Sequence, residues 1–172
     1  MSSGTPDNPY LPPYHLTAFQ NGINTSKRPV MGSVVVLTSA QLLALQTTAV
    51  NIEPSPSTVA VTGKVSLLLV LERMTLEYIY NSTAYTIGGS GVNLQIEYVG
   101  KAVALATAAA TGLVDQTAST VVSVAAAAAG NLAVTNCLNL GFEMKLVGTT
   151  PALTLGNGTL KVVLNWTMVV ID

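Results

Sequence analysis

The sequence predicts an all-β protein: an antiparallel β-sandwich or jelly roll of about eight strands, with one or two short helices and an extended N-terminal arm. The clearest observation is near the C-terminus, where odd positions include Lys161, Asn165 and Thr167 and the even positions are large and apolar. A strand with one buried face has this period of two, because successive side chains leave a pleated backbone on opposite sides. Similar runs recur along the chain while helical signals are few, and eight strands is the number in a two-sheet jelly roll. The even positions are Leu160, Val162, Leu164, Trp166, Met168 and Val170.

Residues 1–32 differ from everything that follows. Five of the eight prolines lie here, and no period of two or 3.6 is present. Because proline fixes φ and removes a backbone donor, we expect an extended arm, residues 1–32, ahead of a β-sandwich domain, residues 33–172. Disordered tails are usually poor in aromatic residues, whereas this segment contains Tyr10, Tyr14 and Phe19. These aromatic residues favour an arm that docks across a neighbouring subunit or a host surface. The alternatives are an arm that folds back onto its own sheet and one that is merely mobile. The candidate contact residues are Tyr10, Tyr14, His15, Phe19, Lys27 and Arg28.

The first elements of the domain are short. Gly32–Leu37 is expected to form a strand, and Thr38 stands three residues before Gln41 in the spacing of a capping box, which predicts one or two helical turns through Leu45. A second short strand is expected over residues 49–52 and ends at a proline-rich loop.

The middle of the chain contains two β-rich runs separated by a polar segment. Residues 65–80 form a long β-rich run with apolar residues on both faces, which indicates a strand that is covered on both sides. Residues 81–91 are polar and glycine-rich, and we expect Gly88-Gly89-Ser90-Gly91 to be a loop between strands because no Lys-Ser/Thr pair follows it as in a phosphate-binding loop. Residues 92–99 alternate again.

The last third contains a weak region and two strands. Residues 101–134 are small, and we expect a short helix or irregular turn around residues 112–116, flanked by small-residue strands or loops. Residues 139–147 alternate clearly. Gly156-Asn157-Gly158 then predicts a tight turn that needs positive φ, so that the chain closes with a long antiparallel hairpin.

Composition restricts the possible partners. The chain is 49% hydrophobic and only 9% charged, against roughly 25% charged residues in an ordinary domain. No run of about 20 apolar residues predicts a membrane helix, and no signal peptide is expected, so we expect other protein chains to cover this surface and folding to occur in the cytoplasm. A net charge of −1 argues against nucleic acid, and a single cysteine, Cys137, argues against disulfides.

Residues suited to catalysis are scarce. The one histidine, His15, lies in the arm, and the eight acids form no metal-binding motif. We expect Glu97 and Glu143 to be solvated residues on polar strand faces. The sequence therefore predicts neither an enzyme nor a metal or cofactor.

Three segments resemble a family of small virion proteins of tailed phages. They are Leu37-Thr38-Ser39-Ala40-Gln41-Leu42-Leu43-Ala44-Leu45, then Tyr80-Asn81-Ser82-Thr83-Ala84-Tyr85-Thr86 with Gly88-Gly89 and Leu94 after it, and Gly156-Asn157-Gly158-Thr159-Leu160-Lys161-Val162-Val163. The resemblance implies a capsid decoration or cement protein: a trimeric β-sandwich bound to the major capsid protein on the outside of the mature head.

Low charge and absent chemistry agree with such a structural role. The alternative function is a head-fibre or tail-associated module that binds a receptor or glycan, for which the predicted loops offer mainly Tyr80 and Tyr85 as exposed aromatics.

Overall fold

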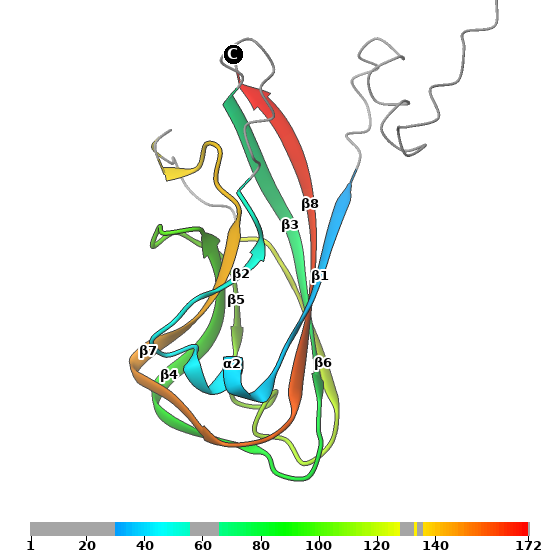
Figure 1. Ribbon diagram of the computed structural model, residues 1–172, viewed down its shortest axis with the longest axis vertical. Helices are drawn as coiled ribbons and strands as arrows, with labels where there is room; N and C mark the ends of the chain where they lie inside the picture. Colours follow the sequence, from blue (N-terminus) through cyan, green and yellow to red (C-terminus); the bar gives the residue numbers. More distant parts are fainter. Residues whose placement is uncertain (1–29, 56–65, 128–132, 134–135, 172) are drawn as a thin grey trace, which may run out of the picture.

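The computed structural model describes residues 30–55, 66–127, 133 and 136–171. Within these residues the chain forms eight strands and one short helix (Figure 1). The elements are β1 (Met31–Leu37), α2 (Ser39–Ala44), β2 (Val50–Glu53), β3 (Ser66–Ile79), β4 (Tyr85–Tyr98), β5 (Ala104–Ala109), β6 (Thr120–Ala125), β7 (Phe142–Leu155) and β8 (Thr159–Ile171). The predicted arm residues Tyr10, Tyr14, His15, Phe19, Lys27 and Arg28 lie outside the described residues.

The strands form two antiparallel four-stranded sheets. Sheet A has the order β1-β8-β3-β6 and sheet B the order β2-β7-β4-β5. Strands that lie next to each other in a sheet include β1 with β8, β2 with β7, β3 with β6 and β4 with β5, so the eight described strands form one long folded hairpin wrapped into two layers. This is the connectivity of an eight-stranded jelly roll, and the predicted fold class is confirmed.

The core lies between the inner faces of the two sheets. In β8 the predicted apolar face is buried from Leu160 to Trp166, but Met168 and Val170 are exposed. The reason is visible in Figure 1, where the ends of β3 and β8 extend past the ends of β4 and β7 and no longer face the opposite sheet.

A bulge in β3 changes which positions of the strand face the core. Pairing with β8 shifts register between Leu71 and Arg73. Before the shift the buried residues are Leu69 and Leu71, and after it they are Met74, Leu76 and Tyr78. One extra residue therefore moves the inward face from odd to even positions.

The capping box is present as predicted. The Thr38 hydroxyl accepts a hydrogen bond from the Gln41 amide at 3.3 Å, and the Gln41 side chain accepts one from the Thr38 amide at 2.9 Å. The short helix α2 that follows packs Leu42 into the core, and its C-cap residue Leu45 is also buried there.

The predicted loop at Gly88–Gly91 is wrong, because these residues belong to a bent β4 that stays paired with β7. Gly89 and Gly91 have φ of 93° and 60°, and the register shifts twice around Ser90. A Cβ at Gly89 would lie 2.4 Å from the Thr149 carbonyl oxygen, so the strand bends where only glycine allows the backbones to approach.

The predicted closing hairpin is also wrong. β7 lies in sheet B and β8 in sheet A, so residues 156–158 cross between the sheets. Neither glycine there has positive φ; the left-handed residue is Leu155, with φ of 61°. Glycine is needed because a Cβ at Gly156 would lie 2.3 Å from the Tyr85 ring and one at Gly158 would lie 2.5 Å from the Tyr78 ring.

The region of small residues after residue 101 forms β5, an irregular turn and β6. Of the predicted alternatives, the irregular turn flanked by small-residue strands is the one present. The Gly112 amide donates to the Asp115 carboxylate at 2.7 Å within the turn. Small residues on β5 let it pack closely at the edge of sheet B.

Candidate interaction surface

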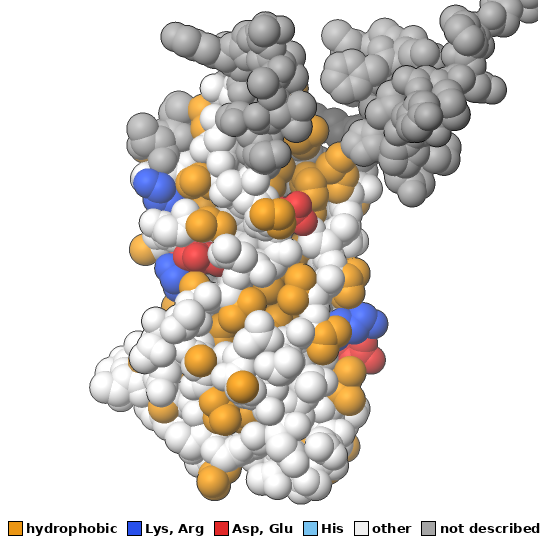
Figure 2. Space-filling model, in the orientation of Figure 1, with side chains coloured by type: hydrophobic (Ala, Val, Ile, Leu, Met, Phe, Trp, Pro, Cys, Tyr) orange, Lys and Arg blue, Asp and Glu red, His pale blue; other side chains and the backbone are white. Residues whose placement is uncertain are grey.

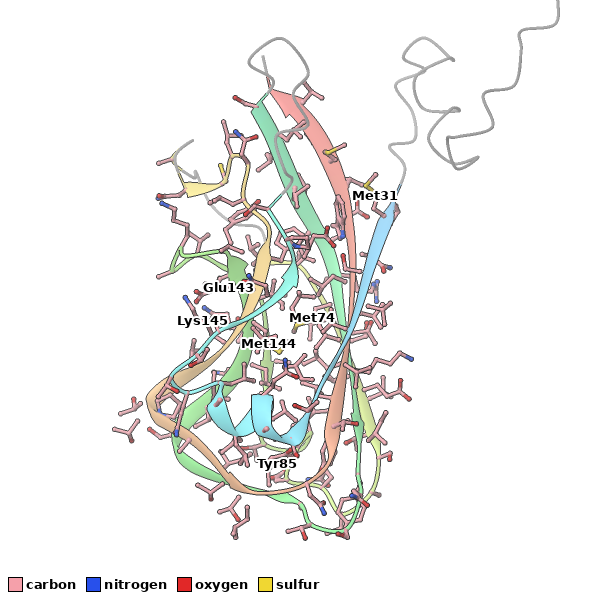
Figure 3. The ribbon with its side chains drawn as sticks, in the orientation of Figure 1. Met31, Met74, Tyr85, Glu143, Met144 and Lys145 are labelled. Atoms are coloured by element: carbon pink, nitrogen blue, oxygen red, sulfur yellow. The ribbon has the colours of Figure 1, made fainter. Side chains whose placement is uncertain are left out.

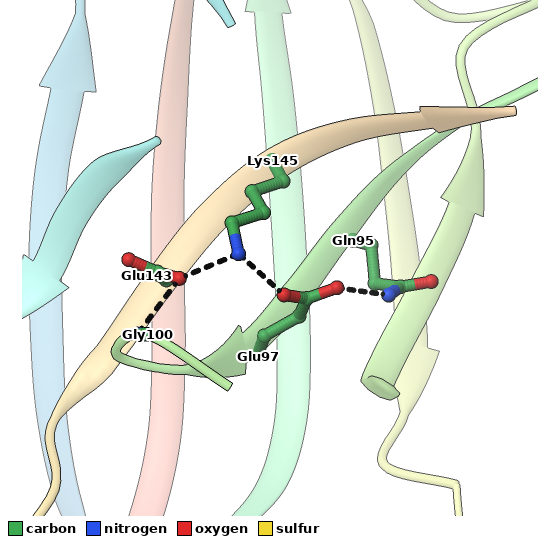
Figure 4. A network of polar contacts seen from close by, with 5 residues as sticks. All are labelled: Gln95, Glu97, Gly100, Glu143 and Lys145. Carbon is green, nitrogen blue, oxygen red and sulfur yellow. Dashed lines mark hydrogen bonds and ion pairs between the residues drawn. The ribbon is translucent and has the colours of Figure 1, made fainter. Parts of the chain in front are cut away.

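A compact charged cluster lies on the outer side of sheet B, where β4 and β7 pair (Figure 4). Glu97 and Glu143 are direct cross-strand neighbours, and Lys145 reaches between them with its ammonium nitrogen 2.9 Å from each carboxylate. Like charges placed directly opposite each other destabilise a sheet. Lys145 therefore offsets the repulsion that the register of β4 and β7 creates.

Both carboxylates of this cluster are buried, which corrects the prediction that they are solvated. Glu97 is 3% exposed and Glu143 is 6% exposed. The Gln95 side-chain amide donates to Glu97 at 2.5 Å and the Gly100 backbone amide donates to Glu143 at 3.0 Å. Loss of water is thus compensated by fixed donors, as buried charges require.

The same contacts hold the lysine in its charged form. The hydrogen bonds that Lys145 donates to Glu143 first and to Glu97 second raise the pKa of Lys145 above its usual value, although partial burial opposes them. A lysine that stays protonated serves as a cation and not as a nucleophile. The contacts of the cluster join β4 to β7.

A second polar chain links the two sheets. The Trp166 indole N–H of β8 donates to the Ser33 hydroxyl of β1 at 2.8 Å, and that hydroxyl donates to the Glu53 carboxylate of β2. Ser33 is buried, so each of its hydrogen-bonding functions is used in a setting that water does not reach. This chain fixes the edge strands β1 and β2 across the sandwich and was not foreseen in the sequence.

Within the described residues no group of three or more His, Cys, Asp or Glu side chains is placed to hold a metal ion. No helix in that part of the chain is long and apolar enough to cross a membrane.

Exposed apolar residues are concentrated on sheet A. Of the eight large hydrophobic side chains that are exposed among the described residues, six lie on strands of sheet A and one immediately precedes β1. They are Val30, Val34, Val36, Ile79, Val121, Met168 and Val170, and the eighth is Leu155 of β7. Figure 2 shows that charged side chains are few in the view drawn and form small groups among apolar and uncharged atoms.

The outer face of sheet A, meaning the side turned away from sheet B, has a regular composition. Across its four strands one row reads Val36, Lys161, Glu77 and Val121, with Val36 and Val121 more than half exposed. Lys161 and Glu77 form an ion pair at 3.0 Å, so the row has no net charge. The neighbouring rows read Val34, Val163, Thr75 and Ser123, and then Gly32, Asn165, Arg73 and Ala125. The outer face therefore carries exposed valines among polar side chains, with an ion pair in one row and Arg73 in another.

The two loop tyrosines are placed differently from each other. Tyr85 is buried at the end of the sandwich that is drawn lowest in Figure 3. Its hydroxyl donates to the Gly158 carbonyl at 2.7 Å, and its ring meets Tyr78 edge to face at 6.1 Å. Burial first, and the neighbouring Tyr78 second, raise the pKa of Tyr85 to about 12. The half-buried Tyr80 donates to the Ser82 carbonyl. The aromatic platform expected for glycan binding therefore loses Tyr85 to the core.

The segments that carry the family resemblance meet at one end of the sandwich. Leu37 pairs with Leu160, and the Asn157 side chain accepts hydrogen bonds from the backbone amides of Ser82 and Thr83 at 3.1 and 2.9 Å. These contacts join the three segments at one end of the sandwich, where β3 turns into β4 and β7 crosses to β8. We call this the closed end of the fold. These contacts are structural and do not touch the outer face of sheet A.

Comparison with known proteins gives few likenesses. No family model matches the chain, and no curated protein matches it. Among solved structures it is similar to a chain of the cyanophage Pam1 capsid asymmetric unit, with a TM-score of 0.45 and 15% identity over 81% of this chain and 83% of that chain. Likeness at this level carries no argument about function. The class defined by the chain's own features is a jelly roll whose apolar surface gathers on one sheet.

Proposed function

We propose that the protein is a structural virion protein, a capsid decoration or cement protein that assembles as a homotrimer and binds the major capsid protein on the outside of a phage head. The observation that carries this proposal is the group of exposed apolar side chains on the outer face of sheet A, in a chain with only 9% charged residues. They are Val34, Val36, Ile79 and Val121. Monomeric proteins rarely expose contiguous apolar patches of large size, so such a face supports a protein partner. The resemblance in the three segments at the closed end supports a virion protein as the class.

The outer face of sheet A is the surface we assign to the trimer contact. Lys161 and Glu77 neutralise each other on this face, the Arg73 guanidinium donates to the Ser123 hydroxyl at 3.2 Å, and exposed valines supply apolar area. These valines are Val34, Val36 and Val121. Stable interfaces bury about 1,200–2,000 Å² in total, and apolar area contributes about 25 cal/mol per Å² before the costs of association. We assign the contact to this face because its exposed valines supply apolar area.

The proposed effect on the shell follows from mass action. A protein that binds the expanded shell and not its disassembled subunits stabilises the shell by about 2.7 kcal/mol per site at a free concentration one hundred times the Kd. Three linked binding surfaces in one trimer raise the effective affinity without any single strong contact. A neutral, non-enzymatic sandwich made in the host cytoplasm and attached to the capsid exterior is suited to this role.

The test combines oligomeric state and shell binding. We expect light scattering at micromolar concentration to give three times the chain mass, and the double substitution Val34→Glu and Val121→Glu to give a folded monomer that does not attach to heads. The control is Thr154→Glu, which adds a charge at an exposed position of β7 in sheet B and leaves the trimer unchanged. A wild-type monomer, or a double variant that still forms trimers and decorates shells, contradicts the proposal.

A further inference from the structure

The last five residues of β8 have an open edge. β8 pairs with β3 as far as Ile171, opposite Ser66, but its pairing with β1 ends at Trp166, opposite Met31. Over residues 167–171, no strand among the described residues pairs with the β1 side of β8. Among the described residues, the backbone N–H and C=O groups along that side have no partner strand, and such groups can pair with an added strand.

The open edge is flanked by apolar side chains. Met168 and Val170 are 40% and 54% exposed on the side that continues the core face, with the half-buried Met31 beside them at the start of β1. Residues 167–171 contain no charge, proline or glycine. Proteins normally protect an edge strand from unwanted pairing with a charged residue, a proline or a bulge. An edge strand without these features is normally covered by another segment of protein.

The chain's own continuation of β1 is a poor cover. Val30, the residue that would pair next with Thr167, lies outside the strand and is 59% exposed. Pro29 stands immediately before Val30 in the sequence, and proline has no N–H to donate to a strand ladder. Residue 29 therefore cannot donate a backbone hydrogen bond to this edge.

A segment from another copy has the required reach and sequence. Twenty-nine residues precede the described part of the chain, and their one long proline-free stretch begins at Tyr14. Within it residues 14–19 read Tyr-His-Leu-Thr-Ala-Phe, a segment with enough apolar side chains to cover Met168 and Val170. About 12 residues separate Phe19 from Met31, which span up to roughly 40 Å when extended, enough to reach a neighbouring subunit.

We infer that the edge of β8 at residues 167–171 is an acceptor for residues 14–19 of a second copy, which add a strand to sheet A by β-augmentation. The contact is heterologous, because an arm on one copy meets an edge on the next, and it closes into a ring when three copies are related by a threefold axis. In this respect the inference rests on the proposed trimer. Backbone hydrogen bonds supply affinity, and the two exposed side chains of β8 select apolar residues in the arm.

Photo-crosslinking of the full-length protein tests this. Benzoylphenylalanine is placed at Met168 or at Val170, with Val121 on the outer face of sheet A as the control position, and equal amounts of isotopically light and heavy chains are mixed before irradiation. We expect mixed-isotope crosslinks from positions 168 and 170 to residues 14–19, and none to that segment from position 121. Leu16→Pro, which removes a donor from the added strand, should abolish these crosslinks, whereas Ser2→Pro should not.

The outcomes separate the two proposals. Crosslinks that join only chains of the same isotope, crosslinks to a different part of the neighbour, or no crosslinks to residues 14–19 overturn the arm exchange. If the protein is then still a trimer by light scattering, the proposed function stands without it. A monomer overturns both.

Discussion

Lys145 and Lys161 form a natural pair for measuring how burial changes the value of an ion pair. Each projects from the outer side of a sheet and contacts a glutamate of the neighbouring strand at 2.9 or 3.0 Å, and Lys145 also contacts Glu143 of its own strand at 2.9 Å. They differ in what surrounds the partner: the side chains of Glu97 and Glu143 are 4% and 8% exposed, whereas that of Glu77 is 41% exposed. The substitutions Lys145→Met and Lys161→Met remove the same charge from these two settings.

The expected losses follow from the solvation of the glutamates that remain. Lys145→Met leaves two buried carboxylates facing each other without a cation, and breaking a buried pair in this way costs about 3–5 kcal/mol. Lys161→Met leaves a carboxylate that water solvates, and exposed pairs contribute about 0–1 kcal/mol. Against a total stability of about 5–15 kcal/mol, the first change is severe and the second is barely measurable.

The assay is urea denaturation at one fixed protein concentration, since assembly makes apparent stability depend on concentration. In about 1 M salt the small effect of Lys161→Met should vanish, because the screening length falls to about 3 Å, while that of Lys145→Met should persist. Replacing Glu97 and Glu143 with Gln together with Lys145→Met should recover most of the loss. Equal destabilisation by the two single substitutions would refute the reasoning.

Two further predictions concern the closed end and the buried tyrosines. Gly158→Ala should destabilise the fold by about 1–3 kcal/mol in the same assay, because its Cβ would lie 2.5 Å from the Tyr78 ring. Gly32→Ala, whose Cβ meets only a carbonyl at 3.7 Å, should change stability by less than about 1 kcal/mol, and similar losses for the two glycines would contradict the packing argument. Burial raises the pKa of Tyr85 and of Tyr98 from 10.0 to about 12, so the folded state holds these protons more tightly, and stability is full below pH 10 and falls between pH 10 and 12. Absorbance titration of the folded protein should show both hydroxyls ionising late, and ionisation of every tyrosine near pH 10 before unfolding would contradict it.

The sequence predicts faces well because alternation is a local property. In β7 the residues Phe142, Met144 and Leu146 are buried as their spacing indicates, and the capping box at Thr38 begins the helix where expected. These features need only the residues themselves and the geometry of one element. The fold class follows once enough such strands are counted.

The errors arise where a distant partner decides. Gly156 and Gly158 have the local pattern of a hairpin turn, but the rings of Tyr78 and Tyr85 pack against them and direct the chain into the other sheet. Glu97 has the alternation of a solvated residue, but its environment depends on the register of β4 against β7. The pairing register and the sheet to which a strand belongs depend on strands far apart in the chain. The residue spacing within one strand therefore cannot predict them.

The nesting of strands also governs how the protein folds. β4 and β5 are neighbours in sequence and pair locally, whereas β1 pairs with β8, so Ser33 meets Trp166 only after nearly the whole chain exists. Pairings between such remote segments carry a large loop-closure cost and are typical of domains that fold in about milliseconds to seconds. On the ribosome, β1 emerges first and stays without its sheet neighbour until translation reaches the final strand, so sheet A is completed only as synthesis ends.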